Sequence, residues 1–241
     1  MNGITSADLE EVRIAVSTAA LDAKLITIRK DLAVFASGVF SEVGTQLHVA
    51  GYIFGTDRKE GKSPFRYGSD EVVGMSVLLR IGGQLISASA ELLTEGRPYA
   101  GAALLRQIVE IEYLAWAFES RHRDAERWLR SDRDIREKFF KPAKLRAASK
   151  GKFRGKDYGF HCELGGHPVP TGTVLLKGDP STAQLLLSDL LGHTGGAWNH
   201  FVGWAKRHED YTAHFKSHAL TMAEKFHNWN SSDPLVELPP P

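Results

Sequence analysis

The chain has 241 residues, with 30 Lys and Arg against 29 Asp and Glu, so its formal net charge is +1. The length allows one large domain or two small ones. The near-neutral balance excludes a global attraction to nucleic acid or membrane, so any such attraction must be local. Cys162 is the only cysteine. It excludes an intramolecular disulfide and fits a reducing compartment.

The N-terminal residues MNGITSADLEEVRIAV carry acids where a signal peptide has basic residues. No segment approaches about 18 uninterrupted apolar residues, the length that a membrane-spanning helix needs. We therefore expect a soluble, cytoplasmic protein that does not contact a membrane.

The first half of the chain predicts two long helices. The first begins after Ser6, a suitable N-cap, and its apolar residues recur at helical spacing toward His48. The stretch 55–70 is rich in Gly, Ser and charge and predicts a loop. A second helix opens near Ser69 or Asp70 and ends before Gly96. One polar stripe on it indicates a solvent face or a polar seam beside a cleft: Ser76, Arg80, Gln84, Ser87 and Glu91.

A third helix begins near Pro98 and includes LLRQIVEIEYLAWAFE, residues 104–119. It is apolar on nearly every side, which is typical of the central helix of a bundle. Arg106 and Glu110 are four residues apart and share a face with Tyr113. The pair either fixes packing as an ion pair or forms the floor of a polar cavity. Glu112 lies on another face and needs a partner of its own or solvent.

The second half predicts a fourth helix over residues 124–140, then a Gly/Pro-rich loop over 143–178. Asp179 and Pro180 are suited to start further helices, which continue to about residue 229. The end, residues 230–241, has the composition of a flexible tail. The sequence therefore predicts an all-α helical bundle, with one domain over residues 1–229 and a Gly/Pro-rich loop insertion before the C-terminal helices.

Residues 138–156 form a basic segment without acids, in which phenylalanines are interleaved. Such clusters are typical of phosphate binding. The segment is either a solvated surface, a site for RNA or another polyanion, or a site for an acidic protein. Its candidate nucleic-acid-binding residues are Lys138, Lys141, Lys144, Arg146, Lys150, Lys152 and Lys156.

The next segment, YGFHCELGGHPVP, contains several groups suited to acid–base or metal chemistry. A zinc site of His161, Glu163 and His167 matches no specific spacing, and the zinc deaminase motif requires more cysteines than this chain has. A Cys162–histidine nucleophile lacks flanking signatures. The sequence therefore predicts no metal and no other cofactor, with a zinc site at these three residues as the alternative left open. The later histidines are interpreted as a mixture of surface and core residues.

The motifs AGAALLRQIVEIEYLAWAF, RWL and Tyr-x-x-His-x-Glu resemble a group of uncharacterised bacterial all-helical proteins near the HEPN and abortive-infection families. The resemblance spans about residues 72–167. HEPN ribonucleases carry Arg-x(4–6)-His on a helix at a dimer interface. Arg154 and His161 fit that spacing, although Gly155 and Gly159 between them favour an irregular segment.

The resemblance implies a homodimer in which Arg154 holds the scissile phosphate of RNA and His161 or His167 acts as acid or base. The first hypothesis is thus a bacterial defence or toxin-type protein that binds or cleaves RNA. The second is a non-catalytic helical adaptor or scaffold, in which the Arg106–Glu110 pair serves packing only.

Overall fold

A computed structural model describes residues 14–53 and 69–236 of the chain, and within these ranges it contains helices and no strands. The predicted all-α bundle is confirmed. Its five long helices are α2 (Ala23–Ile53), α3 (Asp70–Thr94), α4 (Pro98–Ser120), α9 (Pro180–Ala205) and α11 (Lys216–Ser232).

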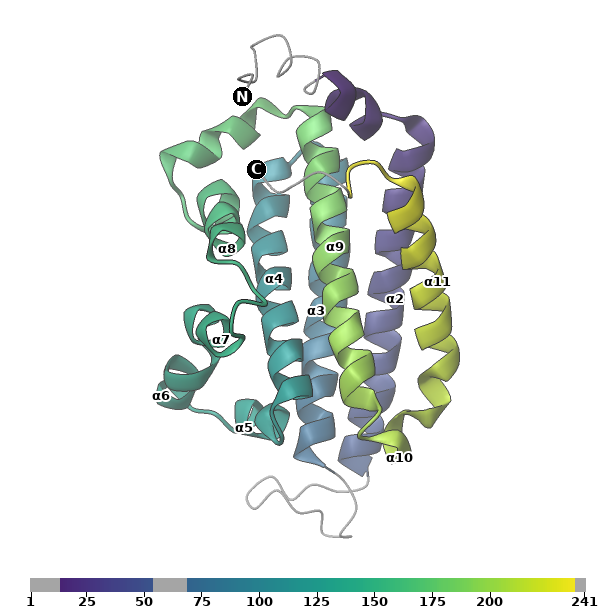
Figure 1. The fold of residues 1–241 in the computed structure, drawn as a ribbon, viewed down its shortest axis with the longest axis vertical. Coiled ribbons are helices and arrows are strands. Elements are labelled where there is room, and N and C mark those ends of the chain that lie inside the picture. The colour runs from purple at the N-terminus through teal and green to yellow at the C-terminus, as the bar shows by residue number, and fades with distance from the viewer. Residues whose placement is uncertain (1–13, 54–68, 237–241) are drawn as a thin grey trace, which may run out of the picture.

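The long helices run along one axis, and their order determines which helices are parallel (Figure 1). Helices α2, α3 and α4 alternate in direction. The chain then climbs back along the side of α4 through residues 124–179, which we call the insertion, so that α9 starts at the same end of the bundle as α4. Parallel α4 and α9 therefore pair residues in the same register along their length, and α11 completes the bundle beside α2.

Buried apolar side chains from all five long helices join into one cluster. Gly83 lets α2 and α3 approach closely, since a Cβ there would lie 2.3 Å from the Ser41 Oγ. Helix α3 is long and apolar enough to span a membrane, but 61% of its most apolar window is buried inside the bundle, as in a core helix. Its predicted polar stripe is exposed from Arg80 to Glu91, whereas Ser76 is buried.

The first predicted helix differs from the observed structure. The chain is helical over residues 14–20, breaks at Leu21 and restarts as α2, with the Asp22 carboxylate accepting the Leu25 N–H. The predicted start at Ser6 and most of the predicted loop over 55–70 lie outside the described residues. Ser69 caps α3 as expected, by accepting the Val72 N–H.

The predicted tail begins too early at residue 230, because α11 continues to Ser232 and the next residues pack on the bundle. Asp233 forms a fully buried ion pair with Arg29 of α2, with 2.6 Å between Nε and Oδ2. Leu235 is also buried. Residues 237–241 lie outside the described part. Composition alone indicated a tail. It could not reveal the ion pair, because Arg29 is 204 residues away in the chain.

The predicted fourth helix over 124–140 is broken into three pieces, and the predicted loop after it is largely helical. A turn at Arg130–Asp132 separates α5 (Asp124–Leu129) from α6 (Arg133–Ile135), and the Asp132 side chain caps α6. The remaining pieces are η1 (Arg136–Phe140), α7 (Pro142–Ala148), α8 (Gly155–His161), η2 (Cys162–Gly166) and η3 (Pro170–Lys177). Helices α7, α8, η2 and η3 pack against α4, which composition alone does not reveal.

Candidate functional site

His161 is the last residue of α8, and the chain after it forms the π-helical turn η2. Gly155 and Gly159 lie inside α8, so the expectation of an irregular segment at this motif was wrong. Gly165 holds η2 close to α4, since a Cβ there would lie 2.7 Å from the Ala103 backbone nitrogen. This close packing places the His161 side chain inward, and only 2% of the residue is exposed.

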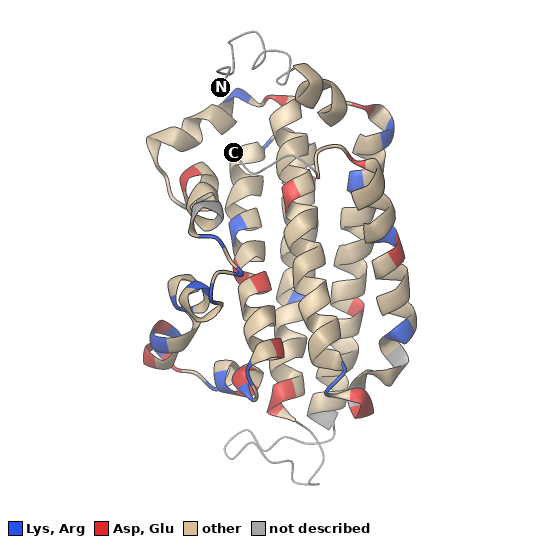
Figure 2. Cartoon of the chain, in the orientation of Figure 1, with Lys and Arg blue, Asp and Glu red and all other residues tan. Residues whose placement is uncertain are grey.

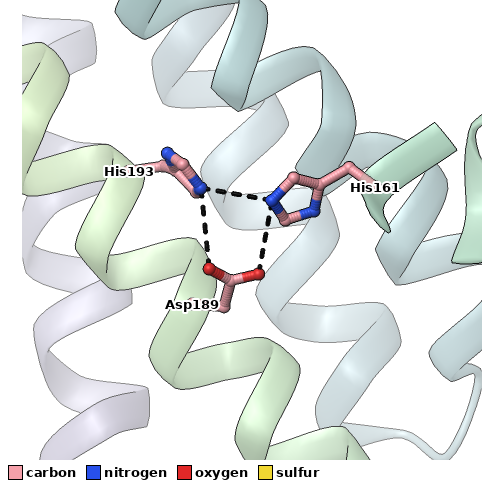
Figure 3. Close-up of side chains that lie close together, drawn as sticks. All are labelled: His161, Asp189 and His193. Atoms are coloured by element: carbon pink, nitrogen blue, oxygen red, sulfur yellow. Dashed lines mark hydrogen bonds and ion pairs between the residues drawn. The ribbon is translucent and has the colours of Figure 1, made fainter. Parts of the chain in front are cut away.

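Asp189 and His193 come from α9 and lie four residues apart, so their side chains project from the same face. They meet His161 at the boundary between α9 and the insertion (Figure 3). The two Nε2 atoms of His161 and His193 are 3.2 Å apart. Each carboxylate oxygen of Asp189 faces one imidazole, at 3.6 Å from the His161 Nε2 and 3.6 Å from the His193 Nε2.

Glu112 of α4 fixes the orientation of His193. Its Oε2 lies 2.7 Å from the His193 Nδ1 on the side away from Asp189. A carboxylate only accepts hydrogen bonds, so Nδ1 carries the proton, and Nε2 faces Asp189 and His161. The sequence indicated that Glu112 needs a partner or solvent, and His193 is this partner. Gly196 leaves the room for it, because a Cβ there would lie 2.2 Å from the Glu112 Oε1.

A cavity of about 600 Å³ opens beside this group, within the usual volume range of small-molecule sites. Asp189 and His193 lie on its α9 wall, with Glu112 behind them. Lys152 and Arg154 line the side formed by the insertion. The end of α11 and residues assigned to the tail from their composition also line the cavity: Trp229, Asn230, Leu235 and Val236.

A second histidine–carboxylate pair lies seven residues further along both helices. His200 Nδ1 is hydrogen-bonded to the Glu119 Oε2, and Gly203 leaves room for this glutamate as Gly196 does for Glu112. The neighbouring ring from the insertion is Phe153, whose centroid lies 6.5 Å from that of His200. The position four residues before His200 is Gly196, so no carboxylate equivalent to Asp189 is present.

The predicted polar core of α4 joins that helix to the insertion. Arg106 and Glu110 form an ion pair of 2.6 Å, and the Tyr158 hydroxyl donates to the Glu110 Oε1 over 2.9 Å. Burial is the main cause that raises the pKa of Tyr158 to about 12, and the Glu110 carboxylate adds to it. Tyr113 is fully buried and packs on Phe153, with 4.1 Å between ring centroids. These contacts attach α8 to α4, and the cavity wall contains Glu112 instead of this pair.

The three predicted catalytic residues do not come together. His161 belongs to the buried group, and Arg154 is exposed on the cavity wall. His167 is exposed, and its carbonyl accepts from the Tyr99 hydroxyl. Glu163 is also exposed and accepts from Thr171. Among the described residues, the group suited to hold a metal ion combines His161 with Asp189 and His193, and neither Glu163 nor His167 belongs to it.

Some residues of the basic segment 138–156 have partners within the protein, and others are exposed. Lys141 pairs with Glu137 over 3.4 Å, and acidic residues lie beside the basic ones at α5 and α6 (Figure 2). The Arg146 guanidinium lies 4.5 Å from the centre of the Tyr158 ring, so this side chain packs inside the insertion. The side chain of Lys156 is outside the described residues. Five predicted residues are exposed: Lys138, Lys141, Lys144, Lys150 and Lys152.

Sequence reasoning missed Asp189, His193, Glu112 and their geometry. A signal was present, since Glu112 and Glu119 are seven apart and HTGGAWNHFVG repeats His-x-x-Gly at the same interval. A seven-residue interval returns to nearly the same face of a helix. The signal requires α4 and α9 to be parallel neighbours, which the insertion between them concealed.

No protein-family model matches the chain, and no curated protein or solved structure matches it either. The HEPN resemblance rests on its motifs and stays a prediction. The chemistry of the site is therefore inferred from the geometry of its own residues.

Proposed function

We propose that the chain binds RNA along the exposed basic residues of its insertion and cleaves a phosphodiester bond at the cavity between the insertion and α9. One observation carries this proposal. Arg154 and Lys152, both exposed cations, line the same cavity as Asp189 and His193. A phosphate held by the two cations therefore lies beside groups that accept and donate protons.

Binding is supported by the charge and the aromatic rings of the insertion. Lys144 and Lys150 are also exposed and belong to the same basic segment as the cavity-lining Lys152 and Arg154. Phe153 and Phe160 line the cavity together with the cations. Basic side chains that follow a backbone, with aromatic rings on which bases stack, are the usual means of holding single-stranded nucleic acid.

Cleavage requires a group that removes a proton from the attacking hydroxyl or water, and a cation that balances charge at the phosphate. The group formed by His161, Asp189 and His193 supplies the first, because Glu112 holds His193 in one tautomer. Arg154 supplies the second. The proposal uses His161 of the two predicted histidines, since His167 lies outside this group.

The test combines binding and cleavage of a labelled single-stranded RNA by the full chain. We expect binding that weakens with salt, by a slope of about 0.7 per phosphate contacted. Lys150→Ser with Arg154→Gln lowers affinity and slope, whereas Lys24→Ser with Lys30→Ser, two exposed lysines of α2, changes neither. His193→Gln abolishes cleavage and leaves binding intact.

Absence of RNA binding at low salt contradicts the proposal and favours the scaffold hypothesis, in which the Arg106–Glu110–Tyr158 contacts serve packing only. Binding without cleavage under every buffer and metal condition reduces the protein to a binding module. Equal cleavage by wild type and His193→Gln places the chemistry elsewhere.

A further inference from the structure

The group formed by His161, Asp189 and His193 has the arrangement of a metal site. Its three side chains come from two segments, 28 residues apart in the chain between His161 and Asp189, and they turn their nitrogen and oxygen atoms toward one point (Figure 3). One ligand atom from each lies within 4.8 Å of the others. We propose that this group binds one divalent transition-metal cation, with Zn²⁺ as the reference ion.

The separations fit such an ion. Zinc binds imidazole nitrogen and carboxylate oxygen at about 2.0–2.2 Å, so two ligands of a tetrahedral site lie about 3.3–3.6 Å apart. The observed separations are 3.2 Å between the two imidazole nitrogens, and 3.6 Å from the His161 Nε2 to Oδ2 and from the His193 Nε2 to Oδ1 of Asp189. Asp189 therefore binds the ion through both oxygens, or turns so that one oxygen serves both sides. Small rotations of the side chains bring all three to bonding distance.

The hydrogen bond from His193 to Glu112 has the form that metal-binding histidines show. A histidine ligand donates its second ring N–H to a carboxylate or carbonyl, which fixes the tautomer and strengthens the ligand. Here the His193 Nδ1 donates to Glu112 and leaves Nε2 toward the shared point. The carboxylates of Glu112 and Asp189 together balance the two charges of the cation.

The site has three protein ligands and adjoins a cavity. Structural zinc sites are closed by four protein ligands, whereas catalytic ones have three and leave a position for water or substrate. Asp189 and His193 line the cavity that also contains Arg154. The fourth position therefore faces the space where an anionic substrate would lie. Two imidazoles with one carboxylate suit Zn²⁺ and Fe²⁺ better than Mg²⁺ or Ca²⁺, which prefer oxygen ligands.

This inference stands on the geometry of the ligands and does not require RNA to be the substrate. The two proposals fail separately, since metal binding is measured without RNA and RNA binding without metal. If both hold, the cation supplies the activated water that the cleavage proposal assigns to this group.

The experiment is calorimetric titration of the EDTA-treated, dialysed full chain with Zn²⁺. We expect one tight site per chain. Asp189→Asn and His193→Gln lower the affinity of this site by more than about 100-fold, because loss of a ligand exceeds the 10–100-fold effect of losing its hydrogen-bond partner. His200→Gln, the matched control at the second pair, leaves it unchanged. Circular dichroism establishes that each variant is folded.

If a variant unfolds, the visible absorption of the Co²⁺-loaded wild type provides the second measurement. An intense tetrahedral band with one equivalent of Co²⁺, displaced by Zn²⁺, supports the site. A wild type that binds neither ion tightly overturns the proposal. Tight binding that His193→Gln retains, or that His200→Gln abolishes, overturns it equally.

Discussion

The two histidine–glutamate pairs between α4 and α9 are alike in nearly every respect except what the insertion adds to them. We call Glu112–His193 the upper pair and Glu119–His200 the lower pair. Both use Nδ1 of the histidine, and both have a glycine three residues after the histidine that makes room for the glutamate. The upper pair faces His161 and Asp189, whereas the lower pair faces Phe153.

The difference shows that a histidine–glutamate hydrogen bond is in itself a packing device. It satisfies two half-buried polar groups where parallel helices meet, and a seven-residue interval repeats it. Metal or acid–base chemistry requires further groups that converge on the histidine Nε2. At the upper pair the insertion supplies an imidazole and α9 supplies Asp189. At the lower pair the corresponding positions hold a phenyl ring and Gly196.

The largest effect is expected from the buried end of the chain, which forms a cavity wall beside the upper pair only. Burial alone would raise the pKa of Asp233, but hydrogen bonds from Arg29, Leu235 and Trp229 hold it below its usual value. Asp233→Ala leaves Arg29 buried without this partner and lowers the free energy of unfolding by about 3–5 kcal/mol. Chemical denaturation measures this change.

The matched control is Glu137→Ala, which breaks the exposed ion pairs of Glu137 with Arg133 and Lys141 and leaves the free energy of unfolding nearly unchanged. Equal effects of the two variants would show that residues 233–236 do not pack as the structure describes. The cavity beside the upper pair would then lack this wall.

The next effect separates the two pairs directly. Glu112→Gln removes the carboxylate that orients a metal ligand, so we expect Zn²⁺ affinity to fall about 10–100-fold. Glu119→Gln removes the same contact from the lower pair and leaves Zn²⁺ affinity unchanged. Titration calorimetry on both variants measures the difference. Equal losses would show that the two pairs do not differ in metal binding.

The smallest effect concerns His208, the imidazole that follows the two pairs and stacks on Trp204 at 4.1 Å between centroids. Burial chiefly, with the nearby positive charges of Arg207 and His122, lowers the pKa of His208 to about 4 from its ordinary 6.5. The neutral form is thus favoured in the folded state. Its contribution to stability is complete above pH 6.5 and is lost as the pH falls through about 4.

This loss is at most about 3 kcal/mol, and about 1–2 kcal/mol after allowance for partial exposure. His208→Phe retains the stacking and flattens the stability profile between pH 7 and 4 by that amount, as denaturation at several pH values measures. His227→Phe, at an exposed position of α11, is the control and leaves the slope as in wild type. If stability falls with pH in His208→Phe as steeply as in wild type, the lowered pKa of His208 is not the cause of this fall.

Much of the fold could be predicted from local pattern. Ser69 and Pro98 mark the starts of α3 and α4, and the apolar residues of both helices recur at helical spacing. The breaks in residues 124–140 and the helices of the insertion could not, since they depend on packing between distant segments: α5 packs mainly against α3, and α7, α8, η2 and η3 pack against α4. The sequence identified His161 as a candidate acid–base residue, but it did not identify Asp189 and His193 as its partners. Asp189 and His193 become its neighbours only when α8 and α9 both pack on α4. Gly165 of η2 and Gly196 of α9 provide the close approach to α4.

The crystal structure of the zinc-loaded chain, measured at the zinc absorption edge, tests the central claim most directly. The account predicts one anomalous peak per chain at about 2.0–2.2 Å from the His161 Nε2, the His193 Nε2 and an Asp189 oxygen. The His193 Nδ1 remains hydrogen-bonded to Glu112. A zinc-loaded crystal with no peak there, or with a peak at His200 and Glu119 instead, would contradict it.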